Sequence, residues 1–222
     1  IIFHTDATQV FPHGLINWKD LPVNLLSASS HKLQGPKGVG ILIKKNIKFK
    51  PQQLGGNQEH SLRAGTEPIA LIAGMAKAIS LIDNQLLLCE KAIEFPETRV
   101  KSLTSFLYKR LSEYPNIKLL GNDINQNRLP NHISILVGNK YNKPISSRLI
   151  VQQLSERGIS CSSGSACKSG VTQDNDVLEA IKVNKEWRRS LIRLSLGPWL
   201  DYNNIEKIPT ILNEVTSLSE HD

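Results

Sequence analysis

Two short apolar runs, each followed at once by polar residues, constrain the fold of this chain most. The first is residues 1–3, in the stretch IIFHTD, and the second is VNLLSAS, residues 23–29. Buried parallel strands have this pattern, because neighbours cover both faces and polar residues begin only where the strand ends. A third such run, GVGILI, occupies residues 38–43. The sequence therefore predicts an α/β fold with a mostly parallel sheet in its first part.

The pattern changes to helical spacing over residues 65–88, where Thr66 is the expected N-cap and Pro68 lies in the first turn. Helices and strands then alternate in an α+β arrangement. Helices are expected over residues 97–114, 146–157, 176–183 and from about 204 onward, and strands over residues 117–121, 132–137, 158–161 and 190–196.

In the strand expected at residues 132–137, Ile133, Ile135 and Val137 would share one face, which is the pattern of a half-buried antiparallel strand. We therefore expect two domains. Residues 1–88 form an α/β part that ends in the long helix, and residues 89–222 form a smaller α+β part.

Composition excludes several classes of protein. The formal net charge of +7 suits an anionic ligand, an acidic partner or nucleic acid. The lysines of KKNIKFK, residues 44–50, fit a solvated sheet edge better than a nucleic-acid surface, so no nucleic-acid partner is expected. There is no long apolar segment, which predicts no membrane span.

The three cysteines, Cys89, Cys161 and Cys167, lack the spacing of a zinc site or a disulfide framework. They indicate a reducing, cytoplasmic location and no metal. The chain opens on what reads as the end of a buried strand, and its single methionine is Met75. We therefore expect it to be the C-terminal part of a longer protein.

A lysine with chemical partners follows the second apolar run. Lys32 comes directly after Ser29, Ser30 and His31, whose hydroxyl and imidazole groups suit an anion such as phosphate. Asp6 ends the first run. Taken singly, Lys32 would be a solvated loop lysine and Asp6 a helix cap. Together, a lysine for a Schiff base and a carboxylate for a ring nitrogen indicate pyridoxal phosphate (PLP).

Five stretches, in this order, extend that reading: HTDATQ, SASSHKLQGPKGVG, GGNQEHSLRAGTEP, SSGSAC and IRLSLG. They resemble the cysteine desulfurases of the class V aminotransferase family, in the group with the SSGSAC loop. The resemblance covers essentially the whole chain. It implies a homodimeric PLP enzyme of fold type I that converts L-cysteine to L-alanine and leaves a protein-bound persulfide. Sulfur-acceptor proteins of iron–sulfur assembly or thiolation pathways are the implied partners.

The resemblance also assigns the two domains and the cofactor site. Residues 1–88 would be the remaining part of the PLP-binding large domain, and residues 89–222 the small domain with the catalytic cysteine loop. Lys32 would carry the cofactor, Asp6 would pair with the pyridine nitrogen, and Gln9 would reach the ring oxygen. The phosphate would be bound by Ser29 and His31.

Three further roles come from the resemblance. Thr66 would bind phosphate, in the family from the neighbouring subunit. Arg193, inside an apolar strand, would bind the substrate carboxylate, and a partner for its charge is expected. Cys167, on a small polar loop, would be the nucleophile that takes the sulfur. Apart from the resemblance, Cys161 in an expected strand and Cys89 at an expected helix end would serve packing.

Three alternatives stay open. The chain could belong to another class V enzyme, either a selenocysteine lyase or an aminotransferase, in which Cys167 would be inert. It could also be a truncated, non-catalytic module that binds acidic partners through its basic surface. The residues that the family uses upstream of Asp6 in the cofactor pocket are absent from this sequence.

Overall fold

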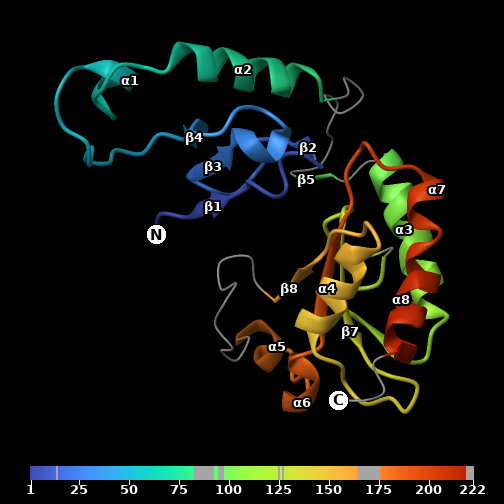
Figure 1. The fold of residues 1–222 in the computed structure, drawn as a ribbon. Coiled ribbons are helices and arrows are strands. Elements are labelled where there is room, and N and C mark those ends of the chain that lie inside the picture. Colours follow the sequence, from blue (N-terminus) through green and yellow to red (C-terminus); the bar gives the residue numbers. More distant parts are fainter. Residues whose placement is uncertain are drawn as a thin grey trace. The chain divides into compact units, whose positions relative to one another are not determined.

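A computed structural model describes residues 1–13, 15–82, 93–94, 98–124, 126, 128–164 and 176–218. The chain divides into two compact units, Ile1–Pro96 (unit 1) and Glu97–Asp222 (unit 2) (Figure 1). The boundary expected from the sequence, between residues 88 and 89, lies outside the described residues and stays a prediction.

Unit 1 is built on a three-stranded sheet of order β1-β3-β4. Its elements are β1 (His4–Asp6), β2 (Leu15–Ile16), β3 (Leu25–Ser29), the 3-10 helix η1 (Ser30–Leu33), β4 (Gly40–Lys44), α1 (Gln58–Ser61), α2 (Ile69–Ser80) and β5 (Ile93–Glu94). Strands β1 and β3 are parallel, and β4 runs antiparallel to β3. The short strands β2 and β5 form an antiparallel pair that the sequence did not predict.

Two expectations about the strands of unit 1 are wrong. The first strand is His4–Asp6, which is in register with Leu25–Ser27 of β3, and residues 1–3 before it are exposed, although the carbonyl of Phe3 still accepts from Leu25 N. The third run is not a further parallel strand. Only residues 30–39 connect β3 to β4, which is too short for a parallel crossover, so the chain returns antiparallel.

The start of helix α2 also differs from the expectation. Pro68 occupies the N-cap and Ile69 is the first helical residue, so Thr66 is not the cap. Proline disfavours helical backbone angles at the residue before it, so Glu67 stays outside the helix and Thr66 with it. Helix α2 is described as far as Ser80, and residues 83–88 of the expected long helix lie outside the described residues.

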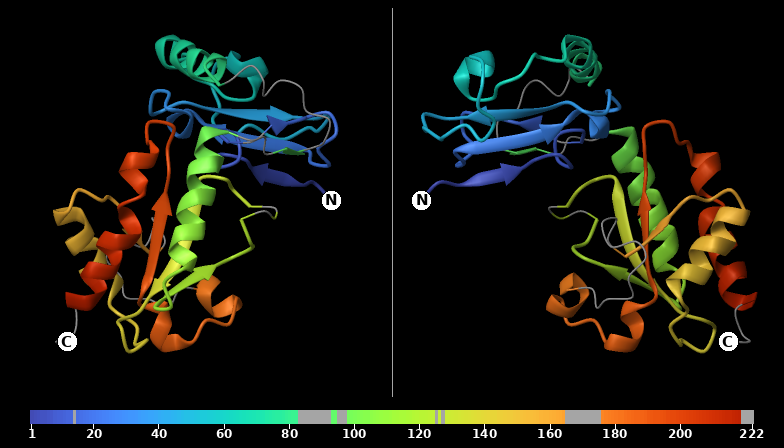
Figure 2. Two further views of the ribbon diagram at one scale, coloured as in Figure 1. Left: turned by 90° about the vertical axis from the view of Figure 1, so that its right-hand side faces the viewer. Right: turned by 60° about the vertical axis from the view of Figure 1, so that its left-hand side comes forward.

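Unit 2 is an antiparallel sheet of order β6-β7-β9-β8 with helices beside it (Figure 2). Its elements are α3 (Arg99–Ser112), β6 (Ile117–Leu120), β7 (His132–Val137), α4 (Ser147–Glu156), β8 (Ser162–Ser163), α5 (Asp176–Ala180), α6 (Lys185–Arg188), β9 (Leu191–Ser195), α7 (Tyr202–Ile205) and α8 (Ile208–Leu218).

The core of unit 2 lies between one face of this sheet and helices α3, α4 and α8. Ile133, Ile135 and Val137 of β7 are fully buried in it, which confirms the predicted face. Burial of aliphatic side chains on this scale is the main source of stability in such a layer.

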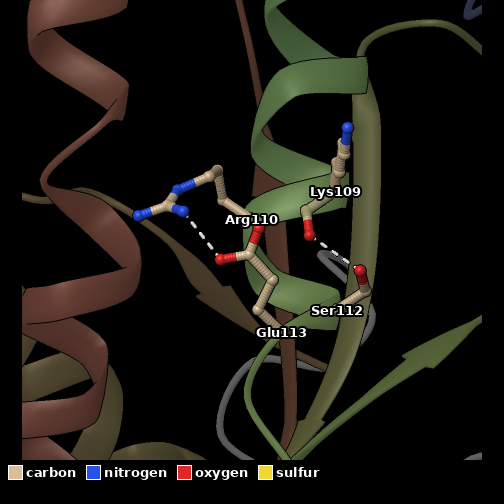
Figure 3. A network of polar contacts seen from close by, with 4 residues as sticks. All are labelled: Lys109, Arg110, Ser112 and Glu113. Atoms are coloured by element: carbon tan, nitrogen blue, oxygen red, sulfur yellow. Dashed lines mark hydrogen bonds and ion pairs between the residues drawn. The ribbon is translucent and has the colours of Figure 1, made fainter.

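At the surface, helix α3 ends in an exposed ion pair, Arg110 Nη1 to Glu113 Oε2 at 2.7 Å, and Ser112 donates to the carbonyl of Lys109 (Figure 3).

Two details of unit 2 correct the sequence analysis. The short strand lies at Ser162–Ser163 rather than at residues 158–161, because these serines pair with Arg193 and Ile192 of β9. The helix expected over residues 176–183 ends at Ala180, and α6 is separate. Lys182 has a φ of 58°, in the left-handed region, so the helix cannot continue through it.

Within the described ranges, none of the helices combines the length and the apolar composition needed to cross a bilayer.

Candidate functional site

The carboxyl ends of β1 and β3 lie next to each other. The two strands are parallel, and Asp6 at the end of β1 is in register with Ser27 of β3. Ser29 ends β3 two residues further, and η1 follows at once with His31 and Lys32. Parallel sheets collect ligands at this edge, because polar side chains and free backbone groups converge there. Unit 1 therefore brings Asp6, Ser29, His31 and Lys32 to one edge of one sheet.

The turn that carries Lys32 is held by its backbone. Ser30 N donates to the carbonyl of Val39 at 3.1 Å, and Gly35 N donates to the carbonyl of Ser30 at 3.1 Å. The side chain of Ser30 is fully buried. Lys32 itself is exposed, and its amine makes no hydrogen bond or ion pair with the described residues. A fixed backbone below a free amine is the arrangement that a covalent lysine needs.

Two glycines allow neighbouring elements to pack closely around this turn. A Cβ on Gly40 of β4 would lie 2.8 Å from the carbonyl oxygen of Ala28 on β3. A Cβ on Gly74 of α2 would lie 2.9 Å from Cγ of Pro36. Both distances are shorter than carbon contacts allow, so β4 and α2 reach the lysine turn only because these residues lack side chains. Helix α2 thus packs against the segment just after Lys32.

Ser29 and His31 are already in contact. Ser29 Oγ and His31 Nδ1 are 2.7 Å apart, which is a hydrogen bond whose direction depends on the tautomer of the ring. The two side chains expected to bind phosphate therefore act as one polar group. Oxygen and nitrogen donors of this kind, beside a lysine and at a strand end, suit an anion.

Asp6 is kept ionised by a neighbour that the sequence analysis missed. Thr8 N donates to Asp6 Oδ1 at 2.9 Å. Hydrogen bonds from the side chain and the backbone of Thr8 lower the pKa of Asp6, with a smaller contribution from His4, while slight burial opposes them. The signal was present in the sequence, because an aspartate at the end of a strand often accepts a hydrogen bond from the backbone N–H two residues further on. The carboxylate therefore keeps its negative charge.

Gln9 and Thr66 are the other two residues of unit 1 that are expected to bind the cofactor. Gln9 is exposed in the turn directly after β1. Thr66 is exposed between α1 and α2, and its side chain makes no hydrogen bond with any residue that the structure describes. None of the contacts described within unit 1 links Thr66 to the ends of β1 and β3.

Arg193 lies on β9 of unit 2, between two serines of neighbouring strands. It is in register with Ser134 of β7 on one side and with Ser162 of β8 on the other. Arg193 Nη2 donates to Ser162 Oγ at 3.1 Å, so the partner found is a neutral hydroxyl, and no carboxylate among the described residues pairs with this guanidinium. Its Nε is buried and has no hydrogen-bond partner among the described residues. A buried N–H without a partner is costly, and a bound acceptor would remove that cost.

Arg193 opens onto a cavity of about 480 Å³ in unit 2. The polar residues of its lining include Arg128, His132, Ser134 and Arg193, and the apolar part of the wall includes Leu129, Val177, Leu178 and Ile181. The sequence analysis did not identify Arg128, His132 or Ser134. Their role depends on the register of β7 against β9, which no local pattern in the sequence reveals.

The cysteines divide into one that is described and two that are not. Cys89 and Cys167 lie outside the described residues. Cys161 is half-buried against the core of unit 2, and burial raises the pKa of its thiol to about 11. A protonated, packed thiol is a poor nucleophile, so Cys161 fits the structural role expected of it. Among the described residues, no group of His, Cys, Asp and Glu side chains could hold a metal ion.

Comparison with known proteins places this geometry in a family. The family model described as aminotransferase class-V matches residues 1–208. Among curated proteins, the cysteine desulfurase IscS of Dictyoglomus turgidum is 37% identical over 97% of this chain. Among solved structures, a NifS-like protein from Rickettsia africae is 30% identical and superposes with a TM-score of 0.78 over 96% of this chain. SspA in complex with cysteine is 30% identical and has a TM-score of 0.64 over 90% of the chain.

The chain spans about half the length of the proteins it matches. The match covers 52% of the Dictyoglomus desulfurase, 53% of the Rickettsia chain and 52% of the SspA chain. The similarity therefore concerns one half of each relative, and it extends across both units of this chain.

Proposed function

Because the chain belongs to the class-V aminotransferase family, we propose that it serves a PLP-dependent cysteine desulfurase, which converts L-cysteine to L-alanine and retains the sulfur as a persulfide. The observation that carries the proposal is that Asp6 ends β1 and Lys32 lies in η1, directly after the end of the adjacent parallel strand β3. The matched relatives named cysteine desulfurase support it, as does the solved SspA structure that holds cysteine.

The chemistry of the donor set fits PLP. Asp6 is a carboxylate with a lowered pKa, which suits a protonated ring nitrogen. Lys32 is an exposed amine without a partner among the described residues, which suits an aldehyde. The contact between Ser29 and His31 suits a phosphate. We assign Asp6, Gln9, Ser29, His31, Lys32 and Thr66 to cofactor binding, Thr66 in the manner of the family from the neighbouring subunit. When bound, PLP supplies an electron sink that makes the Cα proton of an amino acid acidic.

The chain's own residues then have separate tasks. Lys32 holds the cofactor and afterwards takes the Cα proton of the substrate as a general base. Arg193 binds the substrate carboxylate with its planar fork of donors. The Cys167 thiolate forms the S–S bond as the C–S bond of cysteine breaks, so that L-cysteine and the enzyme thiol give L-alanine and an enzyme persulfide.

We further propose that the protein acts as a cytoplasmic homodimer and passes its sulfur to acceptor proteins of iron–sulfur assembly or thiolation. Exposed apolar side chains on and beside helix α2, at Ile69, Ile72 and Leu81, support an association between copies. The absence of a zinc-type or disulfide-type cysteine pattern supports a reducing compartment.

Titration of PLP into the purified chain tests the cofactor assignment. The native chain should develop an absorbance band of bound PLP, and Lys32→Ala should abolish it. Lys37→Ala is the matched control, because Lys37 is an exposed lysine five residues further along the same turn, and it should keep the band. A band of equal strength in Lys32→Ala would refute the assignment of the lysine.

Turnover of L-cysteine tests the nucleophile. Cys167→Ser should keep the absorbance band and stop the release of sulfide in the presence of a reductant. Cys161→Ser, the control, should keep both, because Cys161 packs against the core. Sulfide release by Cys167→Ser at the native rate would exclude Cys167 as the nucleophile and would favour a lyase.

A further inference from the structure

The second face of the sheet in unit 2, opposite the face that packs on α3, α4 and α8, is polar at one end, whereas Leu136 and Leu191 at its other end pack against Leu178 of α5. Along β7, His132 and Ser134 alternate with the buried residues Ile133 and Ile135. Along β9, Arg193 and Ser195 alternate in the same way with Ile192 and Leu194. Successive side chains of a strand point to opposite faces, so these four polar residues share the face away from the core.

His132 is held within this face by hydroxyl groups. His132 Nε2 and Ser134 Oγ are 2.9 Å apart, and His132 Nδ1 lies 3.4 Å from Ser195 Oγ. Ser134 is the residue in register with Arg193, and Ser195 is in register with His132. The imidazole is therefore fixed diagonally from Arg193, on the wall of the cavity that Arg193 also lines.

The charged groups around His132 are both cationic. They are Arg193 of β9 and Arg128 of the loop before β7, and the cavity wall contains no Asp or Glu among the residues that the structure describes. Arg128 is already committed, because its Nη1 and Nη2 donate to the carbonyls of Asn122 and His132, each at 2.7 Å. The Nε atoms of Arg128 and Arg193 are both buried without a partner among the described residues, but Arg193 donates through Nη2 alone, so it keeps its Nη1 for a ligand as well.

We propose that His132 is a positioning residue that couples proton uptake to the binding of a carboxylate at Arg193, so that the affinity of this site for its anionic substrate rises as the pH falls. The inference rests on the proposed function, in which Arg193 receives the carboxylate of the substrate. All of the groups involved lie in unit 2.

The sign of the coupling follows from the surroundings of the imidazole. Burial first, and then the charges of Arg193 and Arg128, lower the pKa of His132, so the ring is neutral at neutral pH. A bound carboxylate adds a negative charge beside these cations and favours the protonated ring. Linkage is reciprocal, so the protonated ring must favour the carboxylate by the same factor. Affinity is thus constant at high pH and rises as the pH falls through the pKa of His132 in the complex.

The test uses L-alanine, the unreactive amino acid, as the probe and the full chain without added PLP. Its carboxylate and ammonium keep their charges between about pH 5 and about pH 7.5, so any pH dependence belongs to the protein. Calorimetric titration of the native chain should show an affinity about threefold or more higher at the lower pH, because half a pKa unit corresponds to about threefold.

Two variants isolate the imidazole. His132→Gln keeps a polar group that can reach Ser134 but cannot take up a proton, so it should bind L-alanine as the native chain does at high pH and lose the dependence on pH. His60→Gln, an exposed histidine of unit 1, is the matched control and should keep the native profile. Arg193→Gln should lose the binding of L-alanine at every pH.

A second measurement applies even if a variant fails to fold. The ring nitrogen resonances of His132 in the native chain, followed by NMR, should titrate at a higher pH when L-alanine is present. A pH profile that survives in His132→Gln, or a His132 titration that L-alanine does not move, would overturn the inference. Either failure is separate from that of the proposed function, which the Lys32-dependent PLP band tests in unit 1.

Discussion

Arg193 Nη2 donates a hydrogen bond to Ser162 Oγ across 3.1 Å, and the two residues are directly opposite each other on β9 and β8. Ser162 is the first residue of the SSGSAC stretch. The backbone pairing and the side-chain bond therefore fix the start of that stretch to the strand that carries the arginine. Two motifs that the sequence shows as separate, SSGSAC and IRLSLG, are thus structural neighbours.

Loss of the Ser162 hydroxyl should weaken the substrate site without disturbing the cofactor site. In Ser162→Ala, Arg193 loses the hydroxyl acceptor that orients its fork. A hydrogen bond to a charged group at a partly exposed position contributes about 1 kcal/mol, so we expect KM for L-cysteine to rise about fivefold. The absorbance of PLP bound through Lys32 should stay unchanged.

Ser163→Ala is the control for this prediction. Ser163 is the other residue of β8, is exposed, and is in register with Ile192 rather than with the arginine. Its substitution should leave KM within experimental error. Equal increases of KM in both variants would mean that β8 acts only through its backbone.

Replacement of the Asp6 carboxylate should separate cofactor binding from turnover. Asp6→Asn keeps the size of the side chain and removes its charge, so PLP should still attach through Lys32, while alanine formation falls by about two orders of magnitude or more. Asp20→Asn, an exposed aspartate of the same unit, should retain activity. An active Asp6→Asn would show that another group would supply the negative charge for the ring nitrogen.

The pH dependence of Asp6 has a defined sign. The hydrogen bonds from Thr8 lower its pKa in the folded chain, so its stabilising contribution is present above the pKa of an unfolded aspartate and is lost as the pH falls through the lowered folded value. Alanine formation limited by this carboxylate should therefore be level from neutral pH down to about pH 5. Thr8→Val removes the side-chain hydrogen bond to Asp6, so the pH below which alanine formation falls should move upward.

Cys161 should resist thiol reagents. Its pKa of about 11 leaves little thiolate near neutral pH, so alkylation by iodoacetamide should be about two orders of magnitude slower than for an unperturbed thiol. Peptide mass spectrometry of the alkylated native chain measures this rate directly. Denaturation with urea before labelling supplies the control, since the unfolded thiol should react at the ordinary rate. Rapid labelling of Cys161 in the folded chain would contradict its packing.

The close approach of β3 and β4 at Gly40 should be needed for cofactor binding. In Gly40→Ala the new Cβ would meet the carbonyl of Ala28, and overpacking of this kind costs about 1–3 kcal/mol. We expect lower thermal stability and weaker PLP uptake although Lys32 is intact. Leu42→Ala, at an exposed position of the same strand, should leave PLP uptake close to native.

Local periodicity was enough to predict most of the elements. The alternation in residues 132–137 predicted the buried face of β7, and the apolar run at residues 23–29 contains β3. The wrong predictions concern positions at which strand pairing or a proline sets where an element begins. Residues 1–3 are apolar but β3 pairs with the residues after them, and Pro68 rather than Thr66 sets the start of α2.

The candidate site was predictable only in part. Asp6 and Lys32 could be identified because each follows an apolar run, and in the structure Asp6 ends β1 while Lys32 lies in η1 just after the adjacent strand β3. Ser162 and His132 could not, because their proximity to Arg193 depends on the register between distant segments. The roles assigned to these residues stay predictions until the variants above are measured.

The hairpin around the lysine has a consequence for how the chain folds. Ser29 pairs with Gly40 across a short connection, whereas His132 contacts Ser195 at a separation of 63 residues. Closing a short loop costs less chain entropy than closing a long one, so contacts that are near in sequence form faster. We expect the β3–β4 hairpin to gain protection from hydrogen exchange early in refolding, and the strand that carries the arginine to join its sheet late.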